Sequence, residues 1–534
     1  MRNAYTIIGF SLSLLLVGCG GGGGDTSVSP TPTTPVTPPS SNVNTWVAGQ
    51  FTSSETLRHL CEVPRTGTNP YDDNKPYPDK PGTALQEKLW VRSYSHETYL
   101  WANELLDNDP ALYDSVFSYF DQLKTTATTP SGKPKDNFHF YQSYEDYIKE
   151  AQSGVRSGYG IRWAFISNKP PRELRVAYTQ TNSQAQQAGV MRGDTVLAID
   201  GININDTTEQ GINTLNRGLA PASGESHVFT LQKVSGETRD VTLIAADIQQ
   251  TPVQNTKVID ASGKRVGYLQ FNQFISVAQP DLINAVKQFS NAQIDALVLD
   301  MRYNGGGLLA LSSQLGYMIA GPGRTANRVF NQSIDNGKGN VYSNANDTIT
   351  GFYNREIDFD ALVFKDTTLP NLDLNTVYIL TTGNTCSASE SLINALLGID
   401  VNVVLIGNTT CGKPYGFFPT PNCGSVFYTI QFKSSNEKGF GDYSDGFSPS
   451  RTPLLATEVN GCVVNDDFDH ALGSSEERLL STALTHIATG TCPVSSGRPA
   501  KASSSTLEIQ GIPLHNPDSI LQSNAIDSAI REKH

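Results

Sequence analysis

The chain has 534 residues, which is too long for one ordinary hydrophobic core, so we expect two to four domains. Hydrophobic residues make up 38% and charged residues only 17%, which is typical of a globular protein rich in uncharged polar residues. Because 52 Asp and Glu outnumber 39 Lys and Arg, the net charge of -13 argues against nucleic acid or an anionic lipid surface held by bulk charge.

The first nineteen residues have the pattern of an export signal. Arg2 is followed by an apolar stretch at residues 7–17, which is too short for a comfortable membrane span. The sequence LVGC then closely resembles a bacterial lipobox, which implies that Cys19 is acylated and anchors the protein to a membrane. Gly20 follows the cysteine in place of an aspartate, and by resemblance to Gram-negative sorting this implies the outer membrane, facing the periplasm or the outside. The alternative is an ordinary signal peptide with an incidental cysteine.

Residues 20–44 form a predicted tether. Five consecutive glycines lead into TSVSPTPTTPVTPPSS, a composition that cannot bury a core. We expect a flexible and then extended linker that holds the folded part away from the lipid surface.

Residues 45–156 are predicted to form a helical N-terminal domain. Apolar residues recur three and four positions apart from Leu85 to Leu106, and the pattern repeats over residues 110–123. Aromatic residues are frequent here, and a stripe at this spacing is more typical of a core than of a ligand site.

Residues 157–250 change character and contain short strand-like runs such as RVAYTQ and RDVTLIAA. AGVMRGD at residues 188–194 and the triplet that ends at Gly201 resemble elements of a PDZ domain. The resemblance implies a loop that binds a peptide carboxylate through backbone N–H groups, with the peptide added as an edge strand. A role in packing or gating is the alternative. The residues at the position of that loop are Gly158, Tyr159, Gly160 and Ile161.

A third region, residues 251–493, begins with predicted strands at 264–274 and 296–300. The triplet Gly305-Gly306-Gly307 follows the second strand, and residues 308–319 read as a helix. A glycine-rich turn between a strand and a helix exposes backbone N–H groups that suit an oxyanion. A nucleotide-phosphate loop is excluded because neither a Walker pattern nor a dinucleotide fingerprint is present.

Residues 381–418 combine a serine with a lysine. A predicted strand at 377–380 precedes a helix that begins at Ser387, and a second strand at 403–406 precedes Lys413. A hydroxyl at a helix N-terminus near a lysine is a candidate nucleophile and base. Ser387 and Glu390 also fit a capping box, and Lys413 alone also fits a solvated surface lysine.

Three motifs in this order, DMRYNGGG, CSASE and IGNTTCGKPYG, together resemble the C-terminal processing (tail-specific) serine proteases. The resemblance implies a multidomain α/β protein with a helical N-terminal domain, a PDZ-like β-rich domain and a crotonase-like α/β protease core. It makes Ser387 the nucleophile and Lys413 the general base, with the N–H groups of Ala388 and Gly306 as the oxyanion hole. Protein or peptide substrates are implied, with no metal or other cofactor.

A lysine accepts a proton only when it is neutral, so its pKa must fall from about 10.4 towards neutrality. We expect Phe417 and Phe418, and the absence of a close carboxylate, to produce this change. Phe417 also stands where many members of the family carry an assisting glutamine. The third catalytic residue therefore stays open: its role is absent, or is filled from elsewhere, for instance by Gln431.

Six cysteines remain if Cys19 is acylated, and disulfides are the default for an exported chain. Fifteen pairings are possible, and the sequence does not choose among them. No Cys/His spacing is that of a zinc site. Candidate pairs are Cys462 with Cys492, Cys411 with Cys423, and Cys386 with Cys411, the last of which would join the serine turn to the lysine segment.

The end of the chain has a predicted helix at residues 476–488 and a tail at 494–534 that is either disordered or folds back on the body. Two rival functions fit the same sequence. One is a peptide-binding protein on the same fold without hydrolysis, and the other is a tricorn-like protease in which a histidine relay replaces Lys413.

Overall fold

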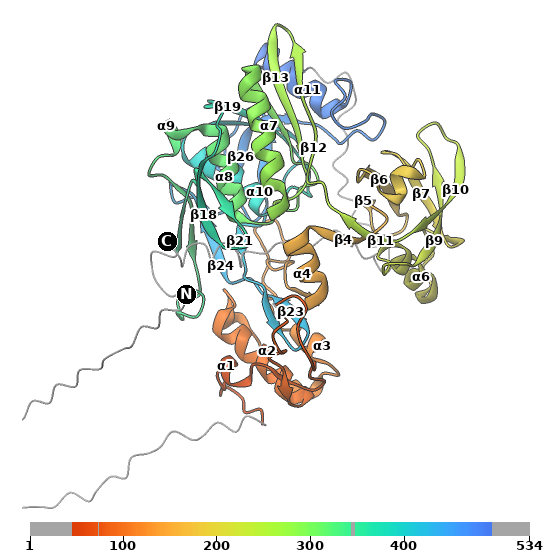
Figure 1. Ribbon diagram of the computed structural model, residues 1–534, viewed down its shortest axis with the longest axis vertical. Coiled ribbons are helices and arrows are strands. Elements are labelled where there is room, and N and C mark those ends of the chain that lie inside the picture. Colours follow the sequence, from red (N-terminus) through yellow and green to blue (C-terminus); the bar gives the residue numbers. More distant parts are fainter. Residues whose placement is uncertain (1–44, 73, 343–347, 494–534) are drawn as a thin grey trace, which may run out of the picture. The chain divides into compact units, whose positions relative to one another are not determined.

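The computed structural model describes residues 45–72, 74–342 and 348–493 (Figure 1). The predicted signal segment with Cys19, the tether at 20–44 and the tail at 494–534 lie outside these residues. Among the helices that the structure describes, none is long and apolar enough to cross a membrane.

A seven-stranded sheet forms the centre of the C-terminal region, in the order β12-β13-β14-β19-β20-β26-β25. The edge strand β12 is antiparallel to β13, and the other neighbouring pairs are parallel. The predicted strands at 264–274, 296–300, 377–380 and 403–406 are confirmed as four of them. The bounds are β12 (Val253–Ala261), β13 (Lys264–Phe271), β14 (Ala296–Asp300), β19 (Thr376–Thr381), β20 (Asn402–Gly407), β25 (Ser448–Ser450) and β26 (Glu458–Val463).

Helices cover both faces of this sheet (Figure 1), which explains why its strands are apolar at consecutive positions. Side chains alternate between the faces: Leu297 and Leu299 of β14 pack towards α7, α8 and α10, whereas Val298 packs towards α11. The predicted helices at 308–319, 387–398 and 476–488 are confirmed. The helix bounds are α7 (Gln279–Ala292), α8 (Leu309–Ala320), α10 (Ala388–Gly398) and α11 (Arg478–Thr489).

Residues 159–245, here called the small β domain, have their own core and an antiparallel sheet in the order β10-β9-β7-β6-β5. Strand β5 is at the end of this order, and β8 pairs with β7. Two short paired strands, β4 and β11, connect the domain to the rest of the chain. The bounds are β4 (Val155–Gly158), β5 (Ile161–Ser167), β6 (Glu173–Thr179), α5 (Gln184–Gln187), β7 (Thr195–Ile199), β8 (Ile202–Asn203), α6 (Glu209–Leu219), β9 (Ser226–Gln232), β10 (Thr238–Ile244) and β11 (Ala246–Gln249).

The N-terminal region, residues 45–154, has one long helix, α2, where the first helical pattern predicts it. The second pattern, at 110–123, yields only a 3-10 turn and the short α3. Strand β3 pairs with β23 from the protease region, and Trp90 packs against Phe427 of that strand. The bounds are α1 (Ser54–Leu57), β1 (Leu60–Cys61), β2 (Lys80–Pro81), α2 (Ala84–Thr98), η1 (Ala102–Glu104), η2 (Pro110–Leu112), α3 (Val116–Phe120), β3 (Phe140–Ser143) and α4 (Tyr144–Ser153).

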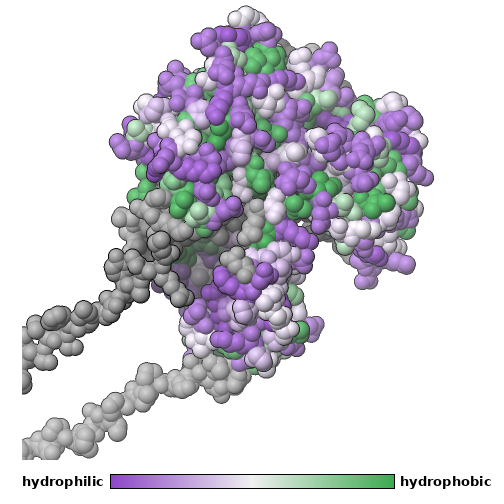
Figure 2. Space-filling model, in the orientation of Figure 1, coloured by the Kyte–Doolittle hydropathy of each residue, from purple (hydrophilic) through white to green (hydrophobic). Residues whose placement is uncertain are grey.

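Smaller elements fill the space around the main sheet of the protease region. On the face seen in Figure 2, hydrophilic residues predominate and hydrophobic residues are scattered among them. The bounds of these elements are η3 (Ser276–Ala278), α9 (Pro322–Thr325), β15 (Val329–Ile334), β16 (Ile349–Gly351), β17 (Arg355–Asp358), β18 (Val363–Thr368), β21 (Tyr415–Gly416), β22 (Thr420–Asn422), β23 (Ser425–Tyr428) and β24 (Phe432–Ser435).

Candidate active site

The glycine triplet forms a tight turn between β14 and α8. Gly307 has φ +130°, and a Cβ there would lie 2.1 Å from the carbonyl oxygen of Phe274, so only glycine fits. The N–H of Gly306 donates to Oδ1 of Asn304 at 2.9 Å. One of the donors predicted for the oxyanion is therefore engaged within the turn, and it is Gly305 that lines the cavity described below.

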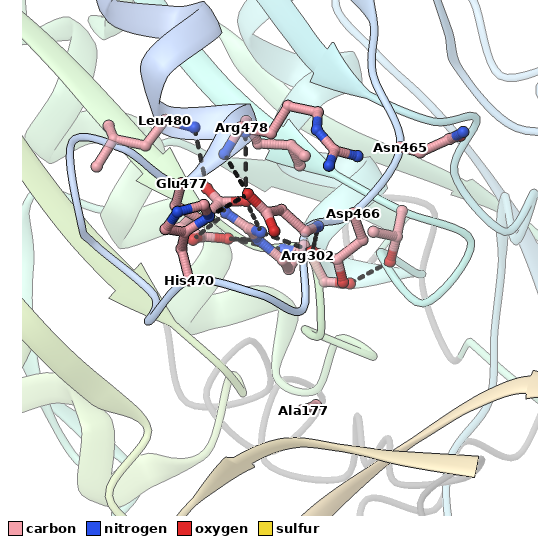
Figure 3. A network of polar contacts seen from close by, with 12 residues as sticks. Ala177, Arg302, Asn465, Asp466, His470, Glu477, Arg478 and Leu480 are labelled. Atoms are coloured by element: carbon pink, nitrogen blue, oxygen red, sulfur yellow. Dashed lines mark hydrogen bonds and ion pairs between the residues drawn. The ribbon is translucent and has the colours of Figure 1, made fainter. Parts of the chain in front are cut away.

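Arg302 anchors this turn through a network of charges in which Asp300 and Glu477 are fully buried and Asp466 is partly buried. Its guanidinium donates to both oxygens of Asp300 and to both oxygens of Glu477, the residue that caps α11. Figure 3 shows Arg302 lying between Glu477 and Asp466, which accepts from the same guanidinium at 2.8 Å. Burial favours the neutral form of Asp466, but Arg302 and Arg192 outweigh it and hold the pKa of this carboxyl below its usual value.

Arg192 extends this network into the small β domain. It donates to Oδ1 of Asp466 at 2.7 Å and to the hydroxyl of Tyr303 at 2.7 Å. Tyr303 also donates to Asp466 and lies next to Asn304 in the turn. Through Arg192, the small β domain therefore contacts Tyr303, two residues before the glycine triplet.

Ser387 stands at the start of α10 in a rare backbone conformation, with φ +55° and ψ -110°. For a residue other than glycine this costs of order 1–3 kcal/mol, and it persists only where the surroundings enforce it. The enforcing bonds run to the glycine turn: the N–H of Cys386 donates to the carbonyl of Asn304 at 3.0 Å, and the hydroxyl of Ser389 donates to the same oxygen. As the first helical residue, Ala388 has an N–H without an acceptor in its own helix.

Glu390 joins the serine turn to the lysine loop. Its Oε2 accepts the backbone N–H of Ser387 at 3.0 Å and that of Lys413 at 2.8 Å. Its Oε1 accepts the N–H of Gly412 at 2.8 Å and the hydroxyl of Thr410. The side chain is completely buried, and burial raises the pKa of Glu390 above its usual value although these four donors oppose the change. The predicted bond from the glutamate to the serine N–H is thus confirmed, and the same carboxylate also holds the lysine.

Lys413 is only 3% exposed, which excludes a solvated surface lysine. Its Nζ lies 4.0 Å from the ring centre of Phe417 and 5.0 Å from that of Phe138. Burial lowers the pKa of Lys413 from 10.5 to about 7, although Asp136 and Glu390 act in the opposite direction. The expected absence of a close carboxylate is therefore wrong, because two buried acids that are distant in sequence reach the lysine.

The other residues expected near the lysine have separate contacts. Phe418 packs against Tyr342 and Phe432. Gln431 accepts the N–H of Phe418 through Oε1 and donates to the hydroxyl of Tyr94 through Nε2. Both ends of the Gln431 amide are thus engaged away from Lys413, which argues against its role as a third catalytic residue.

A cavity of about 790 Å³ lies beside the glycine turn, the serine turn and the lysine loop, and Ser387 itself is not among its lining residues. Lys413, Phe417, Gly305 and Cys386 line it from the protease region. Residues 155–163, which lead from β4 into the small β domain, line the same cavity, and they include the predicted carboxylate-binding residues Gly158, Tyr159, Gly160 and Ile161.

The six described cysteines form three disulfides, so the prediction of disulfides is confirmed. Cys386 pairs with Cys411, which covalently joins the serine turn to the lysine loop, and Cys462 pairs with Cys492. The alternative pairing of Cys411 with Cys423 is wrong, because Cys423 pairs with Cys61 across a sequence separation of 362 residues. Sequence spacing gave no signal for that long-range pair.

The protease region is similar in sequence to known proteases. Residues 265–431 match the model of Peptidase family S41. A carboxyl-terminal-processing protease of Picosynechococcus is 30% identical over 287 residues, covering 53% of this chain and 61% of the relative. The chloroplastic carboxyl-terminal-processing peptidase 1 of Arabidopsis thaliana is 25% identical over 284 residues, covering 52% of this chain and 51% of the relative. The chain thus spans between half and two thirds of the length of these curated relatives.

A solved structure shows that the fold is shared more widely. An S41 protease from Bacteroides fragilis superimposes with a TM-score of 0.55, covering 75% of this chain and 97% of that protein at 22% identity. The mixed α/β fold of S41 proteases is therefore present here, and the prediction of a serine peptidase domain over the matched residues is confirmed.

Proposed function

We propose that this protein is a serine endopeptidase that cleaves protein or peptide substrates through a Ser387–Lys413 dyad. The observation that carries the proposal is the buried lysine, because burial lowers the pKa of Lys413 to about 7. The backbone N–H groups of Lys413 and Ser387 also donate to the same carboxylate oxygen of Glu390. At neutral pH about half of such lysines are uncharged and able to accept a proton.

In this mechanism Lys413 Nζ accepts the proton of the Ser387 hydroxyl as Oγ attacks the scissile carbonyl. The tetrahedral intermediate collapses to an acyl-enzyme, and the same proton passes from Lys413 to the departing amine. Water then attacks the ester, with Lys413 again as the base, and releases the second product. The N-terminus of α10 favours the negative charge that develops on the carbonyl oxygen.

The oxyanion donors in this proposal are the N–H of Ala388 and an N–H of the glycine turn. Ala388 is supported by its position at the first turn of α10. Gly306 serves only if its N–H leaves Oδ1 of Asn304 for the substrate oxygen, and Gly305, which lines the cavity, is the alternative.

We propose in addition that the small β domain is PDZ-like and binds a substrate C-terminus at residues 158–161. Supporting this, the loop lines the same cavity as Lys413, and β5 has an edge position that suits an added strand. The contacts of Arg192 with Asp466 and Tyr303 support a gating role for the same domain, because they reach the glycine turn.

Two rivals are less well supported. A protein that only binds peptides gives no reason for a completely buried lysine, whose burial costs stability. A histidine relay lacks a candidate, since the described residues around the cavity include no histidine. His139 is buried against Phe120, whose carbonyl contacts its Nε2, and burial lowers its pKa to about 4.

The test is peptide cleavage together with labelling by a serine-reactive fluorophosphonate. Ser387→Ala and Lys413→Ala are expected to lose both, whereas Ser481→Ala on α11 and Lys433→Ala on the exposed side of β24 should retain both. Unchanged cleavage by Ser387→Ala contradicts the nucleophile. Full activity of Lys413→Ala favours the histidine relay instead.

The site of action is a separate part of the proposal. We propose that Cys19 is acylated and that the protein acts in a bacterial cell envelope at the outer membrane. The LVGC sequence and the three disulfides, which form in oxidising compartments, support this. Metabolic labelling with a fatty-acid probe should mark the wild type and not Cys19→Ser, and an unlabelled wild type contradicts it.

A further inference from the structure

The lysine pocket has walls from two parts of the chain that are far apart in sequence. Phe417 belongs to the protease region, whereas Phe138 belongs to the N-terminal region, just before β3. Both rings lie within the distance at which an aromatic face attracts an ammonium group. The base therefore depends on a segment outside the part of the chain that matches the peptidase family.

Asp136 and Phe138 act together in this segment. Oδ1 of Asp136 accepts the backbone N–H of Phe138 at 2.9 Å, and Oδ2 accepts the hydroxyl of Tyr99 at 2.8 Å. Asp136 is only 3% exposed, so its charge is poorly screened by water. Its negative charge is one of the two that act on Lys413.

The segment is held firmly against the protease region. The hydroxyl of Thr129 donates to Asp445 at 2.7 Å, and the N–H of Ser131 donates to the same carboxylate at 3.1 Å. On the other side of Asp136, β3 pairs with β23 along its length. Tyr99 is fixed as well, because the N–H of its neighbour Leu100 donates to the carbonyl of Ile430 at 2.7 Å.

We propose that Asp136 and Phe138 are positioning residues for the general base: Phe138 closes the aromatic pocket around Lys413 Nζ, and Asp136 holds the Phe138 backbone and supplies a compensating negative charge. The inference rests on the proposed function, in which Lys413 is the base. It assigns to the N-terminal region a direct part in setting the pH range of the peptidase.

Four titratable groups from the packed elements bear on this pocket. Asp136 from the N-terminal region and Glu390 from α10 both favour the charged lysine, and burial outweighs them. Tyr99 and Tyr415, which lie near Asp136, stay neutral because burial raises the pKa of each, that of Tyr415 to about 12. Removing Asp136 therefore takes away one of these two charges and leaves that of Glu390 in place.

The experiment is the pH dependence of fluorophosphonate labelling in the full chain. In the wild type, labelling should fall below pH about 7 as Lys413 gains its proton. Asp136→Asn keeps the shape but removes a charge that favours protonation, so the acid limb should move to lower pH by about one unit. Phe138→Ala admits water, and because burial is the largest influence on Lys413, this hydration should outweigh the lost attraction of the ring for the ammonium and move the limb to higher pH. Phe138→Leu, which keeps an apolar side chain, should move it less.

Glu104→Gln is the matched control. Glu104 lies in the same region and accepts from Thr125 and Lys135, but it is not among the groups that act on Lys413. Its acid limb should match that of the wild type. A purely structural role for the segment would lower the labelling rate without moving the limb.

The inference would be overturned if the pH midpoint of the acid limb were unchanged in both Asp136→Asn and Phe138→Leu. A higher pH midpoint in Asp136→Asn would also overturn it. If Phe138→Ala fails to fold, which thermal unfolding reveals, the other two variants still decide. If Lys413→Ala loses labelling while the acid limbs of the Asp136 and Phe138 variants do not move, only this inference is refuted. Retained labelling in Lys413→Ala refutes the proposed function itself.

Discussion

Glu390 offers the sharpest test of how this site is assembled. The four donors that meet its carboxylate come from the serine turn and from the lysine loop, two on each oxygen. Glu390→Gln keeps the volume but replaces one acceptor oxygen with an NH₂ group. If NH₂ occupies the Oε2 position, it faces the N–H groups of Ser387 and Lys413. If it occupies the Oε1 position, it faces the N–H of Gly412. At least one buried N–H is left without an acceptor in either orientation.

An orphaned buried donor costs about 1–3 kcal/mol, so Glu390→Gln should lower the free energy of unfolding by about that amount. It should also slow fluorophosphonate labelling by at least tenfold, because in one orientation Ser387 and Lys413 lose their shared acceptor oxygen, and in the other the N–H of Gly412, next to Lys413, loses its acceptor. Urea unfolding and labelling kinetics measure the two effects separately. Asn394→Ala is the control: it removes a buried bond to the carbonyl of Phe440 from the same helix and should lower stability without slowing labelling.

Labelling of Glu390→Gln at the wild-type rate would refute the reasoning, because it would show that the shared carboxylate does not align the dyad. Loss of labelling in Asn394→Ala by the same factor would also refute it. In that case general loosening of α10, rather than the acceptor, would explain the effect.

Three further outcomes are expected. Lys413→Met should stabilise the protein by about 4 kcal/mol at pH 7, since the fold depresses the lysine pKa from 10.5 to about 7. This gain in the free energy of unfolding should shrink as the pH rises and vanish above pH 10.5. Equal gains at pH 7 and pH 11, measured by urea unfolding, would contradict this pH dependence. Replacing Cys386 and Cys411 together by Ser removes a link across 25 residues and should cost about 3 kcal/mol; no loss of unfolding free energy would contradict it. Arg302→Met leaves the buried carboxylates of Asp300 and Glu477 without their cation, and leaves Asp466 with Arg192, and should cost about 3–5 kcal/mol. Arg324→Met at the surface should cost under about 1 kcal/mol, and equal losses would contradict the network.

The sequence alone was sufficient for the strands and helices that present the chemistry. The apolar runs at 296–300, 377–380 and 403–406 have no polar face, which is the pattern of strands covered on both sides. The helix from Ser387 and the turn with Gly307 follow from local rules of spacing and backbone freedom. The short helices at 110–123 show the limit, since tertiary contacts there replaced a regular pattern by brief turns.

Only the tertiary structure decided what surrounds Lys413. Asp136, Phe138 and Glu390 are distant from it in the chain, and no periodicity relates them to the lysine loop. For the same reason the sequence left the partner of Cys61 open, because disulfide pairing depends on where separate segments meet rather than on spacing. The sequence thus determined which residues could perform the chemistry, whereas long-range packing set the charge of the base and supplied the walls that hold it.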